Sequence, residues 1–248
     1  MGKCTVIINN RNLLTWPREM VATIEKWDGL HKIVIIDNDS TYRPLLDWYK
    51  AIPHEVVRLS NLGHAAPFEC GVLSTIETDY YVVTDPDMGL LRTPSDTLIY
   101  LMDHLSESPF LRKIGLGLDW TVVPKESPYY AHTHTYEASL WKKPYRARGL
   151  REAGVDTTFA MYDRRLTQHY FIGGARCDPP YIARHYPWEL TKAQRESDSE
   201  FMYYLANANH SSSFKTFLKL SSVNRSGPLS RPFWMSMWRQ LRKRAGNR

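Results

Sequence analysis

Short apolar runs that each end on polar residues recur along the first part of the chain. They lie at residues 4–10, 31–40, 54–60 and 79–85 and are rich in Val and Ile. Near-continuous apolar runs of this length, with many β-branched residues, are typical of strands that are buried on both faces of a sheet. We therefore predict four strands in this part of the chain.

The residues between the first two runs have helical spacing. Met20, Ile24 and Trp27 fall on one face of a predicted helix over 17–27, and Pro17 suits its first turn. Strands that alternate with helices indicate an α/β fold with a parallel sheet. The predicted fold is a single α/β, Rossmann-like domain with a mostly parallel central sheet flanked by helices.

The pattern is less regular in the rest of the chain. The segment 124–145 is rich in Tyr, Pro, His and Trp, and we predict that it is irregular and lies over a binding site. Ser95 is the predicted N-cap of a helix. The further predicted elements are helices at 68–77 and 94–108 and strands at 112–120 and 179–185.

Polar residues follow each of the four predicted strands. In open α/β sheets, ligands bind beyond the carboxyl ends of the strands. Polar ends on four strands of one sheet therefore predict a binding site at that edge. In strand order, these residues are Asn9, Asn10 and Arg11; Asp37, Asn38, Asp39 and Ser40; Asn61, Gly63 and His64; and Asp85 and Asp87.

Two carboxylates follow the fourth run and are separated only by a proline. Asp85 and Asp87 repel each other, and the stiff Pro86 between them limits relaxation. Hard divalent cations such as Mn²⁺ or Mg²⁺ bind oxygen ligands and commonly lie between carboxylates and substrate phosphates. The alternative is a type I turn in which both acids only cap backbone amides. The three other polar strand ends favour the metal site.

The order and spacing of four motifs resemble the nucleotide-sugar-binding half of a GT-A fold, DxD-containing glycosyltransferase. The motifs are VIINNRN, IVIIDNDSTY, NLGHAAPFECG and YYVVTDPDMGLL, and the resemblance covers residues 3–92. In that superfamily the DxD acids hold a divalent metal against the donor diphosphate, and the end of the second strand grips the nucleoside. This sequence departs from the pattern at DNDST, where many relatives have two adjacent acids followed by Gly.

The resemblance implies a role for each polar strand end. Asp85 would face the ribose and the metal, and Asp87 would bind the metal directly. Gly63 and His64 would lie near the ribose or the diphosphate. The residues that it places near the base and ribose are Asn9, Arg11, Asp37, Asn38 and Asp39.

The resemblance also implies a late metal ligand, frequently His, from the acceptor-binding half. We prefer His185 among the nine His residues, because it follows a predicted strand. It also precedes Pro187 and Trp188, a rigid aromatic corner that suits a sugar site. His210, in an Asn- and Ser-rich segment, is the alternative.

Inverting members of such families need a carboxylate that takes the proton from the acceptor hydroxyl. Asp156 is our candidate because it follows a Gly-containing loop, is predicted to begin a short helix, and precedes His185 in the order found in several inverting families. The structural alternative for Asp156 is an ordinary helix N-cap. Other candidates for the base are Glu189, Asp119 and Glu137, and the predicted acceptor-binding residues are Trp120, Trp188 and Glu189.

Composition bounds the size and location of the protein. At 248 residues with 43% hydrophobic content, the chain can bury one substantial core. We expect a nucleotide-sugar-binding half at 1–95, an acceptor-binding half of the same domain at 96–225, and a basic aromatic tail at 226–248. The three cysteines form no CxxC pair, and we see neither a signal peptide nor a membrane-spanning run. We therefore expect a cytoplasmic protein.

Basic residues gather at the C-terminus. The net charge is +6, and the last ten residues hold five of the 32 basic residues and no acid. As a helix, 231–248 would carry an aromatic face beside a basic one, which is typical of an interfacial anchor on an anionic inner membrane face. Docking of the aromatic residues on the domain is an equal alternative. No nucleic-acid-binding motif accompanies the charge, so nucleic acid is not an expected partner.

The expected function is that of a glycosyltransferase that depends on Mn²⁺ or Mg²⁺. It would move a sugar from a nucleoside diphosphate, in the first instance UDP, to a hydroxyl of a glycan or lipid-linked acceptor, with inversion. One alternative is a nucleotidyltransferase. Such an enzyme would need a Gly-rich basic loop after the first strand to bind a triphosphate, whereas residues 9–19 contain no Gly. The other is a non-catalytic glycan- or membrane-binding module with the same fold.

Overall fold

The structure is a computed structural model that describes residues 2–142, 144–145, 149–166 and 174–208. It confirms the predicted α/β fold with a mostly parallel central sheet. His210 and the tail at 226–248 lie outside the described residues. Over the part of the chain that is described, no helix is both long enough and apolar enough to cross a membrane.

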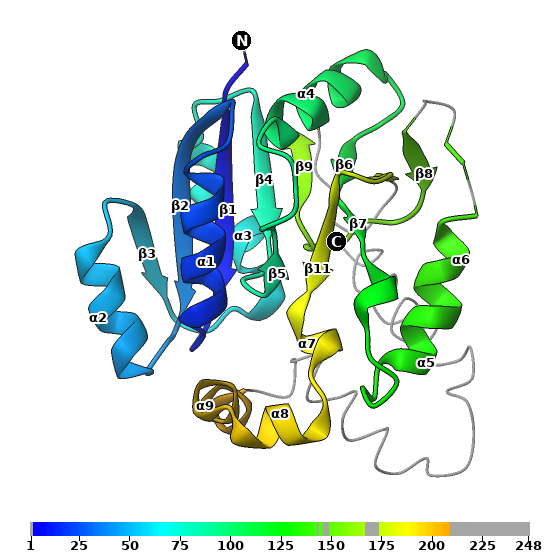
Figure 1. Ribbon diagram of the computed structural model, residues 1–248. Helices are drawn as coiled ribbons and strands as arrows, with labels where there is room; N and C mark the ends of the chain where they lie inside the picture. Colours follow the sequence, from blue (N-terminus) through cyan, green and yellow to red (C-terminus); the bar gives the residue numbers. More distant parts are fainter. Residues whose placement is uncertain (1, 143, 146–148, 167–173, 209–248) are drawn as a thin grey trace, which may run out of the picture.

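The central sheet has eight strands in the order β3-β2-β1-β4-β9-β6-β10-β8 (Figure 1). The strands β3, β2, β1 and β4 are parallel to one another, and so are β6 and β10. Strand β9 runs antiparallel to β4 and β6, and β8 runs antiparallel to β10. Their bounds are β1 Cys4–Asn10, β2 Leu30–Asn38, β3 Glu55–Leu59, β4 Tyr80–Thr84, β6 Lys113–Gly115, β8 Leu150–Glu152, β9 Ala160–Asp163 and β10 Ala175–Cys177.

A second, three-stranded sheet brings the end of the DxD segment against the late strand that carries His185. It consists of β5 Met88–Gly89, β11 Ile182–His185 and β7 Gly117–Leu118, with β11 in the middle. The strand predicted at 112–120 is therefore two strands, β6 and β7, which belong to different sheets. His185 pairs directly with Met88, so the second sheet fixes the distance between His185 and the DxD acids.

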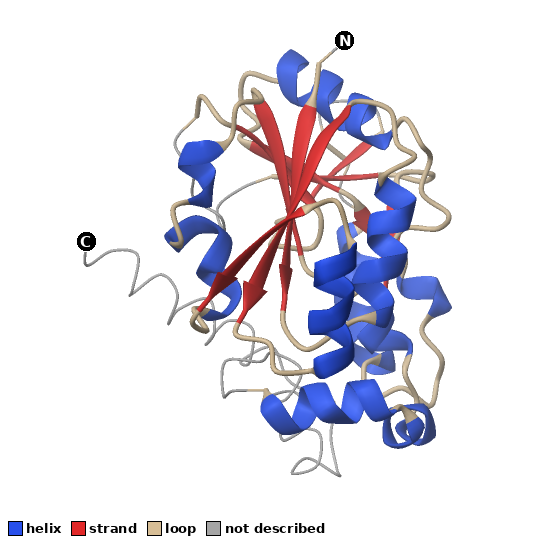
Figure 2. Ribbon diagram, turned by 90° about the vertical axis from the view of Figure 1, so that its left-hand side faces the viewer, coloured by secondary structure: helices blue, strands red, loops and turns tan. Residues whose placement is uncertain are grey.

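Helices lie on both sides of the twisted sheet (Figure 2). Helices α7, α8 and α9 lie below the carboxyl ends of β1, β2 and β4 in Figure 1. The α-helices are α1 Thr15–Ile24, α2 Arg43–Ala51, α3 Ala66–Glu69, α4 Thr97–Glu107, α5 Tyr130–His132, α6 Ala138–Leu140, α7 Tyr186–Glu189, α8 Lys192–Ser197 and α9 Ser199–Asn207. The other helical turns are η1 Gly63–Ala65, η2 Val72–Thr75, η3 Trp120–Val122 and the π-helix η4 Thr133–Glu137.

Successive residues of the central strands enter different apolar clusters on the two faces of the sheet. Ile8 of β1 packs in the cluster that contains Met20 and Ile24 of α1, whereas Ile7 packs with Val34 and Val83 in the other. Each fully buried aliphatic side chain contributes roughly 1.5–3 kcal/mol through burial of apolar surface. The rigid two-sided core explains why the strand ends can hold polar groups in fixed positions.

Several local predictions are wrong. The helix predicted at 68–77 is two short turns, because Gly71 between them has a φ of 82°, which a helix does not accommodate. Ser95 is not the N-cap of α4; Asp96 occupies that position and makes no side-chain capping bond. The segment 124–145 is not irregular throughout, since residues 130–140 form one continuous helical stretch with a π-helical middle.

Candidate functional site

The carboxyl ends of β1, β2 and β3 meet at Gly63, as the sequence predicted. The Nδ2 atoms of Asn9 and Asn38 donate to the Gly63 carbonyl at 3.2 and 2.6 Å, and the Leu62 amide donates to Oδ1 of Asn38 at 2.7 Å. Gly63 has a φ of 73°, a conformation that glycine adopts without strain. Asn9 and Asn38 thus hold the β3 loop, with His64 exposed beside it.

Both carboxylate oxygens of Asp37 accept hydrogen bonds from within the protein, so Asp37 is not open to a ligand. Its side chain is fully buried, Oδ1 accepts from the Ser40 amide at 3.1 Å, and Oδ2 accepts from Nε of Arg58 at 2.9 Å. The next acid, Asp39, is exposed and has a φ of 67°. Asp tolerates this left-handed conformation better than most residues. The backbone therefore turns sharply at the end of β2 and leaves Asp39 facing solvent.

Four buried polar atoms at the predicted site have no hydrogen-bond partner. They are Oδ1 of Asn10, Nε of Arg11, Oδ1 of Asp87 and Nδ1 of His185. Buried polar groups are paired in the great majority of native proteins, so each unpaired group calls for a ligand, an ion or water. Arg11 supplies a donor, whereas Asp87 supplies an acceptor. This combination suits an anionic ligand bound together with a cation.

Asp85 and Asp87 lie at the end of β4 and differ in how the protein holds them. Oδ2 of Asp85 accepts from the Thr157 hydroxyl at 2.9 Å, and the Asp85 amide donates to the Thr157 carbonyl at 2.8 Å. Oδ1 of Asp87 lies 3.7 Å from Nε2 of His185, which is too far for a hydrogen bond. Asp87 and His185 are therefore close to each other but do not form a hydrogen bond with each other.

The environment disfavours negative charge on both acids. Desolvation, then the charges of Asp87 and Asp156, raise the pKa of Asp85 well above its ordinary value. Desolvation also raises the pKa of Asp87, although the nearby His185 opposes this. A divalent cation would remove this penalty by neutralising the charge.

Asp85, Asp87 and His185 are the candidate ligands of a divalent metal, which would complete its coordination with a substrate and water. Across the described residues, no three His, Cys, Asp or Glu side chains form a ready-made metal cage. Mg²⁺ and similar ions are commonly bound by one or two carboxylates plus phosphate oxygens and water. The His185 ring lies 4.5 Å from the Trp188 ring, centroid to centroid, which holds it beside Asp87.

Asp156 lies in a loop before β9 and does not begin a helix, contrary to the prediction. Its Oδ1 accepts from the amide and hydroxyl of Thr158 at 3.0 and 2.7 Å, and the side chain stays accessible to solvent. Desolvation by the surrounding protein raises the pKa of Asp156, but the charge of Arg176 and the Thr158 bonds outweigh it and hold the pKa below its ordinary value. The carboxylate is therefore ionised at neutral pH.

The other candidates for the base are already engaged with the protein. Glu137 is buried and its Oε2 accepts from Arg176 at 2.7 Å, and Glu189 accepts from Nε of Arg184 at 2.8 Å. Oδ1 of Asp119 accepts from the Thr121 amide at 3.1 Å and caps η3. Glu137 and Glu189 are thus paired with arginines, whereas Asp119 is held by Thr121 in the same way as Asp156 is held by Thr158. Asp156 differs from Asp119 in that its charge acts on both Asp85 and Asp87.

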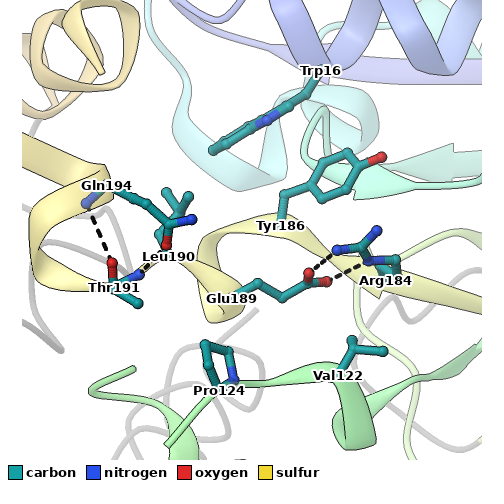
Figure 3. A pocket seen from close by; sticks show the side chains of 9 residues that line it. All are labelled: Trp16, Val122, Pro124, Arg184, Tyr186, Glu189, Leu190, Thr191 and Gln194. Atoms are coloured by element: carbon teal, nitrogen blue, oxygen red, sulfur yellow. Dashed lines mark hydrogen bonds and ion pairs between the residues drawn. The ribbon is translucent and has the colours of Figure 1, made fainter. Parts of the chain in front are cut away.

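A cavity of about 370 Å³ lies beside α7 and is lined also by Trp16, Val122 and Pro124 (Figure 3). Trp16 and Tyr186 form an aromatic wall, with ring centroids 5.8 Å apart, and the Arg184–Glu189 ion pair lies beside the Tyr186 ring. Of the predicted acceptor-binding residues, only Glu189 lines this cavity; Trp188 stacks near His185. Trp120 is elsewhere, against the His134 ring at 5.0 Å between centroids.

No known family model matches the chain, and no curated protein matches it in sequence. Solved structures do match it. One is a mannosyltransferase from Pyrobaculum calidifontis in complex with GDP-Man and Mn²⁺, which is 13% identical, covers 97% of this chain and 80% of that chain, and has a TM-score of 0.48. These matches concern the fold.

Two further matches have lower scores. Glucosyl-3-phosphoglycerate synthase from Mycobacterium tuberculosis, in complex with Mn²⁺, UDP and phosphoglyceric acid, is 14% identical, covers 66% of this chain and 56% of that chain, and has a TM-score of 0.43. A CMP:2-keto-3-deoxy-manno-octonic acid synthetase in complex with CTP is 14% identical. The match covers 66% of this chain and 75% of that chain, with a TM-score of 0.41. A mannosyltransferase and a glucosyl-3-phosphoglycerate synthase are thus among the solved structures that match this chain.

Several residues at the site were not predicted from the sequence. Thr157 bonds to Asp85, Arg176 acts on Asp156, and Lys113 is buried at the start of β6. Only Lys113 gave a sequence signal, as a charged residue that opens an apolar strand. Trp16 and Arg184, which line the cavity, gave none.

Proposed function

We propose that the protein is a metal-dependent glycosyltransferase that uses a nucleoside diphosphate sugar. The observation that carries this proposal is the unsatisfied pair of buried groups, Asp87 and His185, beside Asp85 at the carboxyl edge of the sheet. The sequence resemblance to GT-A fold enzymes supports the same conclusion. Asp85, Asp87 and His185 would hold Mn²⁺ or Mg²⁺, which when bound stabilises the charge that develops on the departing diphosphate.

The donor nucleotide, in the first instance UDP, would lie across the ends of β1, β2 and β3. Arg11 has a buried, unpaired Nε with which to donate to the nucleotide. Asn9 and Asn38 hold the Gly63 loop in place, and His64 and Asp39 are exposed on the same edge. Asp37 would act indirectly, since its carboxylate orients Ser40 and Arg58.

Asp156 would act as the general base. The acceptor hydroxyl attacks the anomeric carbon, its proton passes to the Asp156 carboxylate, and the bond from that carbon to the diphosphate oxygen breaks with the electron pair on the diphosphate. Attack on the face opposite the leaving group inverts the anomeric configuration. The low pKa of Asp156 supports this role, because the base must be ionised before the reaction.

The acceptor would bind in the cavity of Figure 3 and along α7. A sugar fits this cavity because aromatic rings present a negative face to the C–H groups of a sugar ring, while charged planar groups bond to hydroxyls. Trp16 and Tyr186 supply the rings, and Arg184 and Glu189 supply the charged groups. A glycan or a lipid-linked sugar is the acceptor class that matches these walls.

Nucleotide binding is the direct test of the proposed function. UDP should raise the melting temperature in the presence of Mn²⁺, because a ligand selective for the folded state stabilises it by mass action. At 100 times its dissociation constant, UDP would contribute about 2.7 kcal/mol. The measurement is thermal unfolding with UDP, GDP, CMP and CTP, each with Mn²⁺ or EDTA. The absence of a shift with every nucleotide at millimolar concentration would contradict the proposal and favour a non-catalytic module.

Glu189 offers a test of the acceptor cavity that leaves the donor site untouched. In Glu189→Gln we expect the KM for the acceptor to rise roughly 10-fold, because a hydrogen bond to a charged group is worth about 1.5–3 kcal/mol. Hydrolysis of the donor in the absence of acceptor should stay unchanged. Glu196→Gln, on the exposed side of α8, is the matched control. An unchanged acceptor KM in Glu189→Gln would exclude this cavity as the acceptor site.

A further inference from the structure

Three buried charged side chains lie behind the loop that carries Asp156. They are Lys113 from β6, Glu137 from the π-helix η4 and Arg176 from β10, with 1%, 3% and 9% of their surfaces exposed. Charged residues are rarely buried so deeply unless they are paired. Their contacts therefore indicate what they do.

The two cations bond to consecutive backbone carbonyls just before Asp156. Nε of Arg176 donates to the Gly154 carbonyl at 3.0 Å, and Nζ of Lys113 donates to the Val155 carbonyl. Arg176 also donates through Nη1 to Oε2 of Glu137 at 2.7 Å, which gives the cation its counter-charge. We name these three side chains the loop clamp.

The loop is also held on its other side and packed tightly against β6. Thr157, directly after Asp156, bonds to Asp85 through both its hydroxyl and its carbonyl. A Cβ on Gly115 of β6 would meet Cγ1 of Val155 at 2.5 Å, so the loop leaves no room there for a side chain. Phe159 has a φ of 58°, a strained conformation that persists only when surrounding contacts impose it. The loop is thus constrained at every residue around Asp156.

We propose that Arg176 and Lys113, with Glu137 as the counter-charge, are positioning residues that fix the Asp156 carboxylate for proton transfer. This inference rests on the proposed function. Replacing a buried ion pair with apolar residues is often neutral or stabilising, so stability alone does not explain a buried pair. A loop clamp that must hold two backbone carbonyls does explain it.

The loop clamp also sets the charge environment of Asp156. Arg176 is the largest of the influences that lower the pKa of Asp156, and His185 acts in the same direction. The other charged and titratable groups around Asp156 are His64, Asp85, Asp87, Lys113, Tyr136, Glu137 and Tyr162.

The test is Arg176→Lys. Lysine keeps the charge, but a compact ammonium does not reproduce the fork with which Arg176 bonds to Gly154 and Glu137 together. We expect turnover to fall roughly 10- to 100-fold, because a small misplacement of a catalytic group has an effect of this size. The affinity for UDP with Mn²⁺ should stay unchanged. Hydrogen exchange of the amides at residues 155–158 should become faster, while that of β4 should not.

Two further variants separate positioning from general structural support. In the Asp156→Asn background, Arg176→Lys should cause no further loss of turnover, since the group that it positions is already removed. The double variant Arg176→Met with Glu137→Met removes both members of the ion pair together, so neither of them is left without its partner, and it should show the same loss of turnover. Arg151→Lys is the control, because Arg151 of β8 is the cross-strand neighbour of Arg176 but its side chain bonds to Asp178 at 2.6 Å.

The outcomes distinguish a wrong positioning role from a wrong function. Unchanged exchange and turnover in Arg176→Lys, or an equal further loss in the Asp156→Asn background, would overturn the loop clamp. A wild-type protein that turns over no nucleotide sugar would overturn the proposed function and the catalytic part of the inference. The exchange measurement needs no activity, so it decides independently whether the three side chains hold the loop.

Discussion

Replacing Asp87 with alanine is expected to abolish metal-dependent turnover of the donor while the protein stays folded. Asp87 contributes a buried carboxylate oxygen that has no protein partner, and His185 lies 3.7 Å from it. Without Asp87, the metal would keep Asp85 and His185 only, and the diphosphate would lose the charge that balances it. The measurement is hydrolysis of nucleotide sugars with Mn²⁺ and with EDTA. Full activity in Asp87→Ala, or in EDTA, would exclude the metal mechanism.

The same acid gives an expected change in stability, with a definite sign. The pKa values of Asp85 and Asp87 are raised in the folded protein, so folding favours the protonated form of each acid. Each acid therefore stabilises the folded protein at low pH, and this contribution is lost as the pH rises through the pKa of the folded state. At neutral pH and without metal, Asp87→Asn should therefore melt at a higher temperature than the wild type. The difference should shrink as the pH falls toward ordinary carboxyl values, and Mn²⁺ should raise the melting temperature of the wild type more than that of the variant.

The strands and their polar ends could be predicted because local sequence determines them. The first strand was predicted at 4–10, and β1 has those bounds. Its apolar run ends where Asn10 turns back to bond with the Leu13 carbonyl at 2.8 Å and with the Tyr49 hydroxyl at 2.8 Å. The convergence of Asn9, Asn38 and Gly63 followed from the parallel sheet alone, because parallel strands present their carboxyl ends at one edge.

The surroundings of Asp156 could not be predicted, because long-range contacts determine them. An Asp followed by two Thr residues fits a helix N-cap, and that local interpretation predicted a helix. In the structure, Thr157 bonds instead to Asp85, which is 72 residues away in sequence. Glu137 and Arg176 are 39 residues apart and meet only because a π-helix and β10 lie on the same side of the loop. Periodicity carries no information about such pairs.

The proposed site divides into a part that would bind the donor and a part that would react. Asn9, Asn38 and Asp37 are satisfied within the protein, so they shape loops before any ligand arrives. Asp87 and His185 each keep a buried, unpaired atom for a ligand. The preorganised loops favour affinity, and the unpaired groups favour selectivity for a metal-bound diphosphate.

Asp156 and His185 are expected to fail in different ways when replaced. A general base acts in the transition state, so Asp156→Asn should lower turnover by about 10² to 10⁴-fold and leave donor affinity almost unchanged. His185→Ala should instead weaken the binding of metal and UDP together, because the loss of a metal ligand lowers the affinity of the protein for the metal before the reaction begins. Calorimetry of UDP with Mn²⁺ on both variants, beside single-turnover rates, measures the two effects separately.

His134→Ala is a suitable control for the histidine variant, because His134 packs against Trp120 and not against Asp87. Normal turnover in Asp156→Asn would exclude Asp156 as the base. Glu137 and Glu189 would then have to lose their arginine partners before they could act, whereas Asp119 accepts hydrogen bonds from Thr121. A product that retains its anomeric configuration would have the same consequence for Asp156, because the inverting reaction is the one that requires a base on the acceptor side.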